Sequence, residues 1–158
     1  MANTSKKVAV GENSYRKIDV DAYDEDRFIE EESTDNSAGS ALSSRESEVR
    51  AFINKGNAKD AVIKALDNPP IASKDQALKD KNLQIVMDAL NSVKSADVGA
   101  VVKALNSNQV DILMKYIYRG MAFPEKFNSG NLLAWHASAF EVGGHGTIVR
   151  VLTDRKTV

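Results

Sequence analysis

Cysteine is absent from the 158 residues of this sequence, which excludes disulfide bonds and thiolate chemistry. No apolar run approaches the length of about 20 residues that a membrane-spanning helix needs. The opening residues, MANTSKKVAVGENS, also lack the apolar core of a signal peptide. We therefore expect a protein of the cytoplasm that does not insert into membranes.

Histidine, which commonly carries catalysis or binds metals, is also scarce. The only two histidines are His136 and His145, and we expect His136, which follows a tryptophan on an apolar helix, to be a structural residue. The GGHG stretch at 143–146 lacks the Gly-Lys-Ser/Thr of a phosphate-binding loop. A calcium-loop-like stretch at 19–30 has Asp24 where the turn requires glycine. The sequence thus predicts no enzyme activity, no cofactor and no metal site.

No stretch of useful length alternates apolar and polar residues in the way that a β-strand does. Apolar residues recur instead at helical spacing from residue 43 onward. Proline is rare, and Pro69, Pro70 and Pro124 stand where helical patterns end. The pattern at 110–121 is apolar on nearly every side, which is typical of a central helix. We predict an all-α domain of about seven helices joined by short connections.

Two capping boxes indicate where helices begin. Ser43 and Glu46 stand three residues apart ahead of one apolar-periodic segment, and Ser73 and Gln76 stand in the same relation ahead of another. Gly56 fits the position just after a helix end, at which glycine is favoured. We therefore expect helices to begin near the two serines and one helix to end before the glycine.

One short pattern occurs three times in the chain. AVIKAL at 61–66 returns as AVVKAL at 100–105, at an offset of 39 residues, and as TIVRVL at 147–152. A period of about 40 residues with two helices in each unit is typical of HEAT and armadillo arrays. This predicts an α-α superhelix, a HEAT/armadillo-like stack, and a plain helical bundle is the alternative.

Charge divides the chain into two parts. Residues 1–42 hold 5 Lys/Arg against 10 Asp/Glu, whereas residues 43–158 hold 16 against 12. The stretch STDNSAGSALSS at 33–44 has the composition of a linker. We therefore predict an extended acidic N-terminal arm and linker over 1–42 and a helical domain over 43–158. The small positive surplus of the domain is too dispersed for a nucleic-acid site.

The acidic arm contains large apolar side chains despite its charge. They are Tyr15, Ile18, Val20, Tyr23, Phe28 and Ile29. A segment so short and so charged cannot offset the entropy of ordering itself, so these residues do not form a core of their own. Either they are incidental to a solvated tail, or they anchor an extended peptide in the pockets of a partner whose surface is basic.

The helical pattern at 110–121 also carries a basic edge. Lys115 and Arg119 lie four residues apart among aromatic residues, an arrangement that raises the alternative of base stacking. Helical spacing places the two cations on a different face from the apolar residues, so a core helix with a basic edge is favoured. The candidate partner-binding residues of the body are Lys115, Arg119, Arg150 and Arg155.

Six stretches together carry a resemblance to a known family. They are YRKIDVDAYDEDRF (15–28), NPPI (68–71), QALKDK (76–81), VDILMKYIYRG (110–120), LLAWHASAF (132–140) and GTIVRVLTDRKTV (146–158). With them the chain resembles subunit 5 of the actin-related protein 2/3 complex, the small helical subunit of that complex. The resemblance covers the N-terminal motif and the whole helical body, while the serine-rich linker is variable. Asp154 stands where the family pattern has a small residue.

The resemblance implies a non-catalytic subunit of the complex that nucleates branches on the sides of actin filaments. It implies that the helical body docks on the β-propeller subunit and on a neighbouring core subunit. It also implies that the arm tethers the actin-related protein 2 subunit through its apolar residues, and that the protein works in the cytoplasm, the cytoskeleton and cell projections. On the sequence alone, the alternative is a free-standing helical-repeat adaptor that binds peptides.

Overall fold

The computed structural model describes residues 35–71 and 73–158, with side chains from residue 39 onward. The predicted anchors of the arm, from Tyr15 to Ile29, lie outside the described residues. Within the described ranges the chain is all-α, with six helices and no strand. None of these helices is long and apolar enough to cross a membrane.

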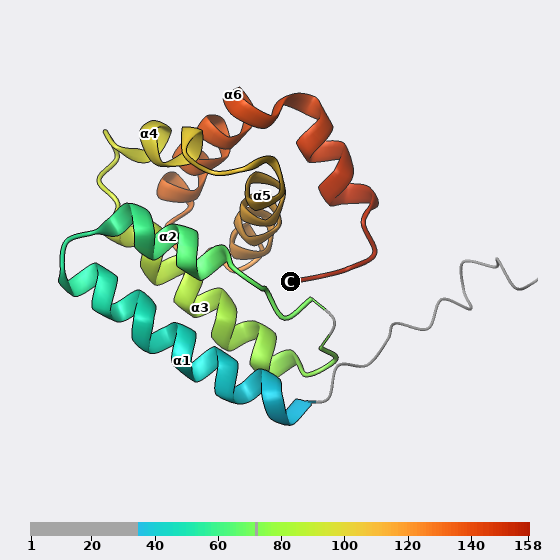
Figure 1. Cartoon of the computed structure of the whole chain (residues 1–158). Coiled ribbons are helices and arrows are strands. Elements are labelled where there is room, and N and C mark those ends of the chain that lie inside the picture. The colour runs from blue at the N-terminus through green and yellow to red at the C-terminus, as the bar shows by residue number, and fades with distance from the viewer. Residues whose placement is uncertain (1–34, 72) are drawn as a thin grey trace, which may run out of the picture. The chain divides into compact units, whose positions relative to one another are not determined.

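Short connections join the helices. They are α1 (Asp35–Asn54), α2 (Ala58–Leu66), α3 (Gln76–Ser92), α4 (Val98–Lys103), α5 (Ser107–Met121) and α6 (Ser129–Thr153). Figure 1 shows α1, α2 and α3 packed together on one side and α6 passing over α4 and α5 on the other. The segment after α6 turns back toward α5, so that the end of the chain lies against the body.

The last predicted helix is continuous with the one before it. The sequence predicts a helix that ends at the Gly143-Gly144 pair and a separate short helix over TIVRVL, whereas α6 covers both. Gly144 has φ 62° and ψ −166°, which is not a helical conformation, so α6 kinks there. We call 129–143 the first limb and 145–153 the second limb of α6. The kink explains why the described residues hold six helices instead of about seven.

Gly144→Ala is expected to destabilise the fold by about 1–3 kcal/mol, because the backbone there adopts a conformation that is nearly restricted to glycine. Nothing lies within 4 Å of the added Cβ, so backbone strain alone is tested. Gly99→Ala in α4 is the matched control, since its Cβ also meets nothing within 4 Å. Alanine is favoured over glycine in a helix by about 1 kcal/mol, so this control should stabilise. Urea unfolding measures both, and a Gly144→Ala protein as stable as wild type would contradict the kink.

The predicted capping box at Ser43 is wrong. α1 begins at Asp35, inside the stretch of linker composition, and the Ser43 hydroxyl donates to the carbonyl of Gly39 (3.1 Å) within the helix. Glu46 forms ion pairs with two basic side chains instead of capping. The reason is tertiary: Leu42 is only 4% exposed and packs in the core, which stabilises the helix upstream of the serine. The division into arm and domain stays a prediction.

The second predicted capping box is also wrong. Asp75 is the N-cap of α3, and its carboxylate accepts a hydrogen bond from the backbone N–H of Ala77 (2.9 Å). The hydroxyl of Ser73 accepts from the N–H of Asp75 (3.1 Å) and so supports the turn before the helix. The predicted end of the first helix is confirmed, because Gly56 follows α1 with φ 75°.

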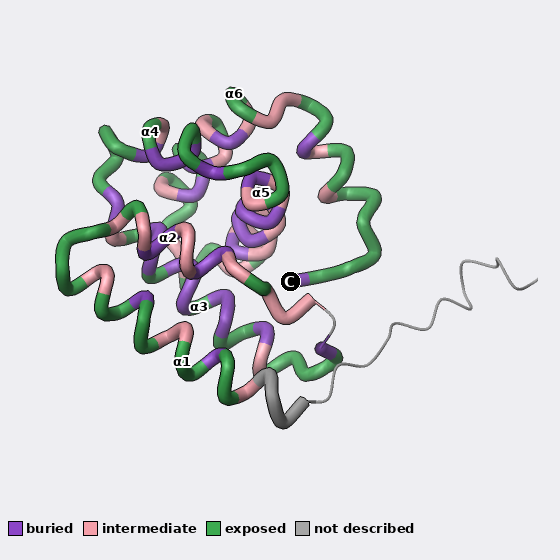
Figure 2. Tube along the Cα trace, viewed as in Figure 1, coloured by how far each residue is buried: buried purple, intermediate pink, exposed green. Residues whose placement is uncertain are grey.

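The prediction that α5 is the central helix is confirmed. Buried residues cover a broad face of it, and Figure 2 shows buried positions all along its length; they are Val110, Ile112, Leu113, Met114, Tyr116, Ile117 and Gly120. The hydroxyl of Tyr116 accepts a hydrogen bond from Asn82 of α3, and burial raises the pKa of Tyr116 to about 12. The Asn82 side chain in turn accepts from Arg45 of α1 (2.9 Å). This polar chain links three helices through the core.

Candidate protein–protein interface

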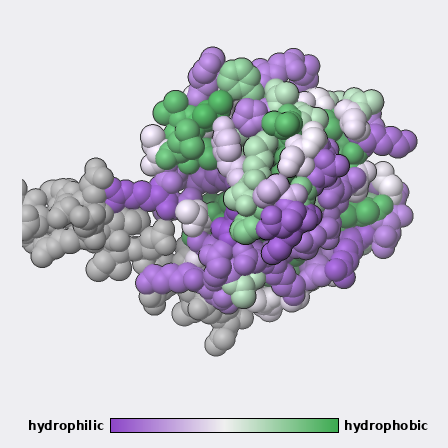
Figure 3. Space-filling view, turned by 180° about the vertical axis from the view of Figure 1, so that it is seen from behind, coloured by the Kyte–Doolittle hydropathy of each residue, from purple (hydrophilic) through white to green (hydrophobic). Residues whose placement is uncertain are grey.

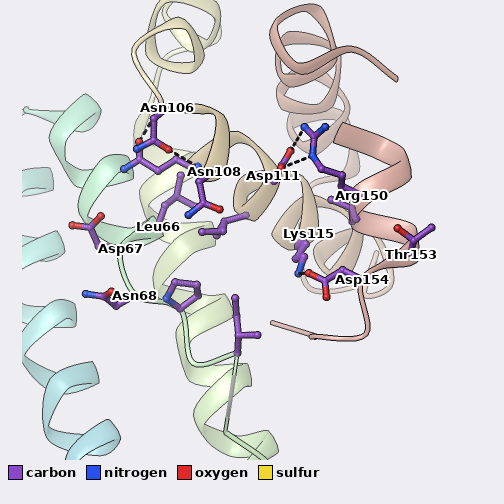
Figure 4. Close-up of a pocket in the computed structure, with 15 residues that line it drawn as sticks. Leu66, Asp67, Asn68, Asn106, Asn108, Asp111, Lys115, Arg150, Thr153 and Asp154 are labelled. Atoms are coloured by element: carbon purple, nitrogen blue, oxygen red, sulfur yellow. Dashed lines mark hydrogen bonds and ion pairs between the residues drawn. The ribbon is translucent and has the colours of Figure 1, made fainter. Parts of the chain in front are cut away.

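A cleft of about 680 Å³ opens between the end of α2, α5 and the second limb of α6. Its lining combines apolar residues such as Leu66 and Ile112 with amide side chains such as Asn106. Figure 4 shows the Arg150 and Asp111 side chains pointing toward each other beside it, and Lys115 and Asp154 doing the same below them. Two of the four predicted partner-binding cations therefore stand in the wall of one cleft.

Both cations of this wall are held by carboxylates. Arg150 makes a two-pronged pair with Asp111, with Nε at 2.7 Å from Oδ2 and Nη2 at 2.8 Å from Oδ1. Lys115 Nζ lies 2.6 Å from Asp154 Oδ2. The pairs fasten the second limb of α6 and the residue after it to α5, because the two members of each pair come from these different segments.

The third predicted cation, Arg119, also has intramolecular partners. Its Nη2 lies 2.6 Å from Asp80 Oδ1 of α3, and its Nη1 donates to the carbonyl oxygen of Val158. Arg155 lies in the exposed segment after α6. The structure thus gives Lys115, Arg119 and Arg150 a role inside the chain, while contact of the candidates with a partner stays a prediction.

Sequence reasoning missed that these cations bind acidic residues of the same chain. The three ion pairs join Asp80 to Arg119, Asp111 to Arg150, and Lys115 to Asp154, and each joins residues 39 apart. The same offset separates the AVIKAL and AVVKAL stretches in the sequence. The signal that could have revealed these pairs is the recurrence of opposite charges 39 residues apart in the sequence.

The ion pairs lower the pKa of their carboxyl groups. A hydrogen bond from Arg150 holds the pKa of Asp111 below its usual value, and hydrogen bonds from Lys115 and Arg119 lower the pKa of Asp154 and of Asp80. The contribution of such a group to stability is complete above its unfolded pKa of about 3.9 and is lost as the pH falls through the lower folded pKa.

We expect thermal stability to be level between about pH 7 and pH 5 and to fall below about pH 4, where the unfolded carboxyls take up protons first. Asp111→Asn should lower the melting temperature near neutral pH and reduce the further fall of the melting temperature in acid. Asp111 is chosen because its side chain is the least exposed of the three paired carboxylates. Exposed Glu125→Gln, which removes the same charge, is the control. Melting temperatures across pH test this, and parallel profiles for Asp111→Asn and wild type would contradict it.

The predicted structural role of His136 is confirmed. Its Nε2 lies 3.1 Å from the hydroxyl of Tyr118, and the two rings meet edge to face. His145, in the second limb, packs its ring against Phe140 at a centroid distance of 4.9 Å. In the described ranges no three His, Cys, Asp or Glu side chains are grouped so that they could hold a metal ion.

Large apolar side chains are exposed on α6. Leu133 and Val142 of the first limb are 59% and 44% exposed, and Val149 and Leu152 of the second limb are 57% and 72% exposed. Figure 3, which shows the molecule from behind, has an apolar group on the side where the second limb lies. Val149 and Leu152 stand three residues apart, on one face of the second limb, and exposed apolar side chains grouped in this way are typical of a surface that binds another protein. Sequence reasoning did not single these residues out.

Comparison with known proteins shows which family the chain resembles. A family model described as "ARP2/3 complex 16 kDa subunit (p16-Arc)" matches residues 14–158. Actin-related protein 2/3 complex subunit 5-C of Xenopus laevis is 44% identical over 145 residues, which cover 91% of this chain and 94% of that protein.

Two further relatives come from distant organisms. Actin-related protein 2/3 complex subunit 5 of Dictyostelium discoideum is 46% identical over 117 residues, which are 74% of this chain and 83% of that protein. Actin-related protein 2/3 complex subunit 5-like protein of Homo sapiens is 40% identical over 144 residues, 91% of this chain and 94% of that protein. The chain therefore belongs to the family of the ARP2/3 complex 16 kDa subunit, p16-Arc, which is a non-catalytic structural subunit.

Proposed function

We propose that this chain is the small helical subunit of an actin-related protein 2/3 complex and that it supports actin filament nucleation and branching as part of that assembly. The observation that carries the proposal is the family match, which extends from residue 14 through all six helices. The relatives from Xenopus and human align over 94% of their own length. The match therefore covers both the arm motif and the body.

The body is proposed to dock on the β-propeller subunit and on a neighbouring core subunit. The exposed apolar residues of α6 support a protein contact on that helix, since Leu152 is 72% exposed. The cations Lys115, Arg119, Arg150 and Arg155 are kept as candidate contact residues. Arg150 supports this best, because its side chain remains 52% exposed while it pairs with Asp111.

The arm is proposed to tether the actin-related protein 2 subunit. Six apolar side chains within an acidic segment support this, because they suit pockets on a partner and cannot form a core by themselves. Contact with actin filaments would then be made through the complex, in the cytoplasm, the cytoskeleton and cell projections.

We also propose that the helices form an α-α superhelix of the HEAT/armadillo kind. Equivalent positions of neighbouring repeats lie close together in such a stack. The three ion pairs at the offset of the repeated AVIKAL pattern support this arrangement.

The experiment is purification of the full-length tagged chain from native extract of its source, followed by gel filtration and identification of the co-eluting proteins. We expect one large complex that contains the two actin-related proteins and a β-propeller subunit. Elution of the chain as a small free protein would contradict the proposal and favour the adaptor. A matched preparation in high salt shows which contacts depend on surface charge, because exposed ion pairs are screened.

A further inference from the structure

The first limb of α6 carries almost no charge. Glu141 is the only Asp, Glu, Lys or Arg in residues 129–143. Exposed positions recur along this limb at helical spacing and form one line, which we call the outer stripe: Gly130, Leu133, Ala134, Ala137 and Glu141. Glu141 stands at the far end of the stripe, where Lys103 of α4 pairs with it at 3.6 Å. The rest of the outer stripe is therefore uncharged over about two helical turns.

The helix on the opposite side of the body exposes a different kind of surface. α1 packs against α2 and α3, whereas α6 packs against α4 and α5, so that these two helices are outer ones, as Figure 1 shows. From Ser43 to Asn54 the exposed residues of α1 are polar apart from Ala51. An outer helix that faces water needs a polar outer face. α1 has such a face and the first limb of α6 does not, which indicates that another molecule covers the outer stripe.

A hollow of about 420 Å³ adjoins the start of the outer stripe. Gly130 and Ala134 belong to both, and the end of α3 with the segment after it forms the opposite wall of the hollow. The side chain of Asn131 donates to that of Asn91 (2.8 Å) and so joins the two walls. Among the described residues, no charged side chain lines this hollow. It can therefore hold a bulky uncharged side chain of a partner that lies on the stripe.

A helix fits this surface better than a loop does. The outer stripe runs along a helix axis, and the small side chains of Ala134 and Ala137 let a second helix approach closely and pack its larger side chains over them. Leu133 projects beside the alanines and is exposed, so it can enter a groove of that helix. A charged residue of the partner would lose its water here without gaining a counter-ion. The contacting face of the partner helix is therefore uncharged.

We propose that the outer stripe is the docking surface for an amphipathic α-helix of another subunit of the complex, and that this helix presents large aliphatic side chains to the stripe. The inference rests on the proposed function, because it requires that the chain assembles with other subunits. It adds which surface of the body makes a contact and what chemistry the partner segment has.

The first test is assembly of the full-length tagged variant Ala137→Arg, purified from native extract of its source and separated by gel filtration. Arginine is a good helix former but places bulk and charge at the middle of the outer stripe. The share of the tagged chain that co-elutes with the complex should fall at least about tenfold relative to wild type. Ala51→Arg makes the same change at an exposed position of α1 and should assemble like wild type.

The second test identifies the molecule that covers the stripe. The photo-crosslinking residue p-benzoylphenylalanine is incorporated in place of Leu133, the complex is purified and irradiated, and the adduct is mapped by mass spectrometry. We expect an adduct within an apolar helical segment of another subunit. An adduct on the β-propeller subunit or on a second copy of this chain, or no adduct, overturns the proposal.

The wild-type chain separates failure of this inference from failure of the proposed function. Equal assembly of Ala137→Arg and wild type would overturn the docking surface and leave the proposed function intact, whereas a wild-type chain that elutes as a small free protein would overturn both. Circular dichroism checks that the arginine variants remain helical. If Ala137→Arg loses its helices, the cross-linking result decides alone, because Leu133 is exposed and its replacement leaves the core untouched.

Discussion

Ile117→Ala is expected to lower the free energy of unfolding by about 2–5 kcal/mol. Ile117 lies in the middle of α5 and has no exposed surface. Because α5 contacts α2, α3 and α6, neighbours on several sides would have to move to fill the cavity that the substitution leaves. Leu113→Ala, one turn earlier and equally buried, should cost a similar amount. Urea unfolding followed by circular dichroism gives both values.

The control is Leu133→Ala, which removes the same atoms from a leucine that is 59% exposed on α6. This change should alter the free energy of unfolding by no more than about 0.5 kcal/mol, because surface substitutions leave no cavity. A cost below about 1 kcal/mol for Ile117→Ala would place the centre of the core elsewhere.

The double change Tyr23→Ala and Phe28→Ala is expected to reduce branch nucleation by the reconstituted complex more than tenfold. Loss of an aromatic anchor at the centre of an interface typically costs about 2 kcal/mol or more. The melting temperature of the isolated subunit should not change, because the arm has no helical period with which to pack on its own domain. The acidic residues of the arm should add a smaller contribution that weakens with salt.

Pyrene-actin assembly with complexes of equal subunit composition measures this effect. The matched control is Val8→Ala with Val10→Ala, which truncates two apolar residues that precede the family match at residue 14. We expect the control complex to branch at the wild-type rate. Equal rates for the control and for the aromatic double change would show that the aromatic residues are not anchors.

The sequence by itself determined which helix is central. The segment at 110–121 is apolar over most of its surface, apart from an edge with Asp111, Lys115 and Arg119, and burying so wide an apolar face requires several neighbouring helices. The sequence also predicted the end of α1 correctly. Gly56, just after the helix, has φ 75°, a backbone conformation that glycine adopts without strain. The residues that identify the family are likewise readable from the sequence without any structure.

The tertiary structure alone decided where α1 begins, how the chain bends at Gly144 and what the basic residues do. Capping preferences are worth about 1 kcal/mol each, so burial of Leu42 outweighs the capping signal at Ser43. The roles of Lys115, Arg119 and Arg150 depend on carboxylates 39 residues away, and only folding brings these groups within 3 Å. The sequence could show that these side chains are charged, but the three-dimensional path of the chain selects their partners.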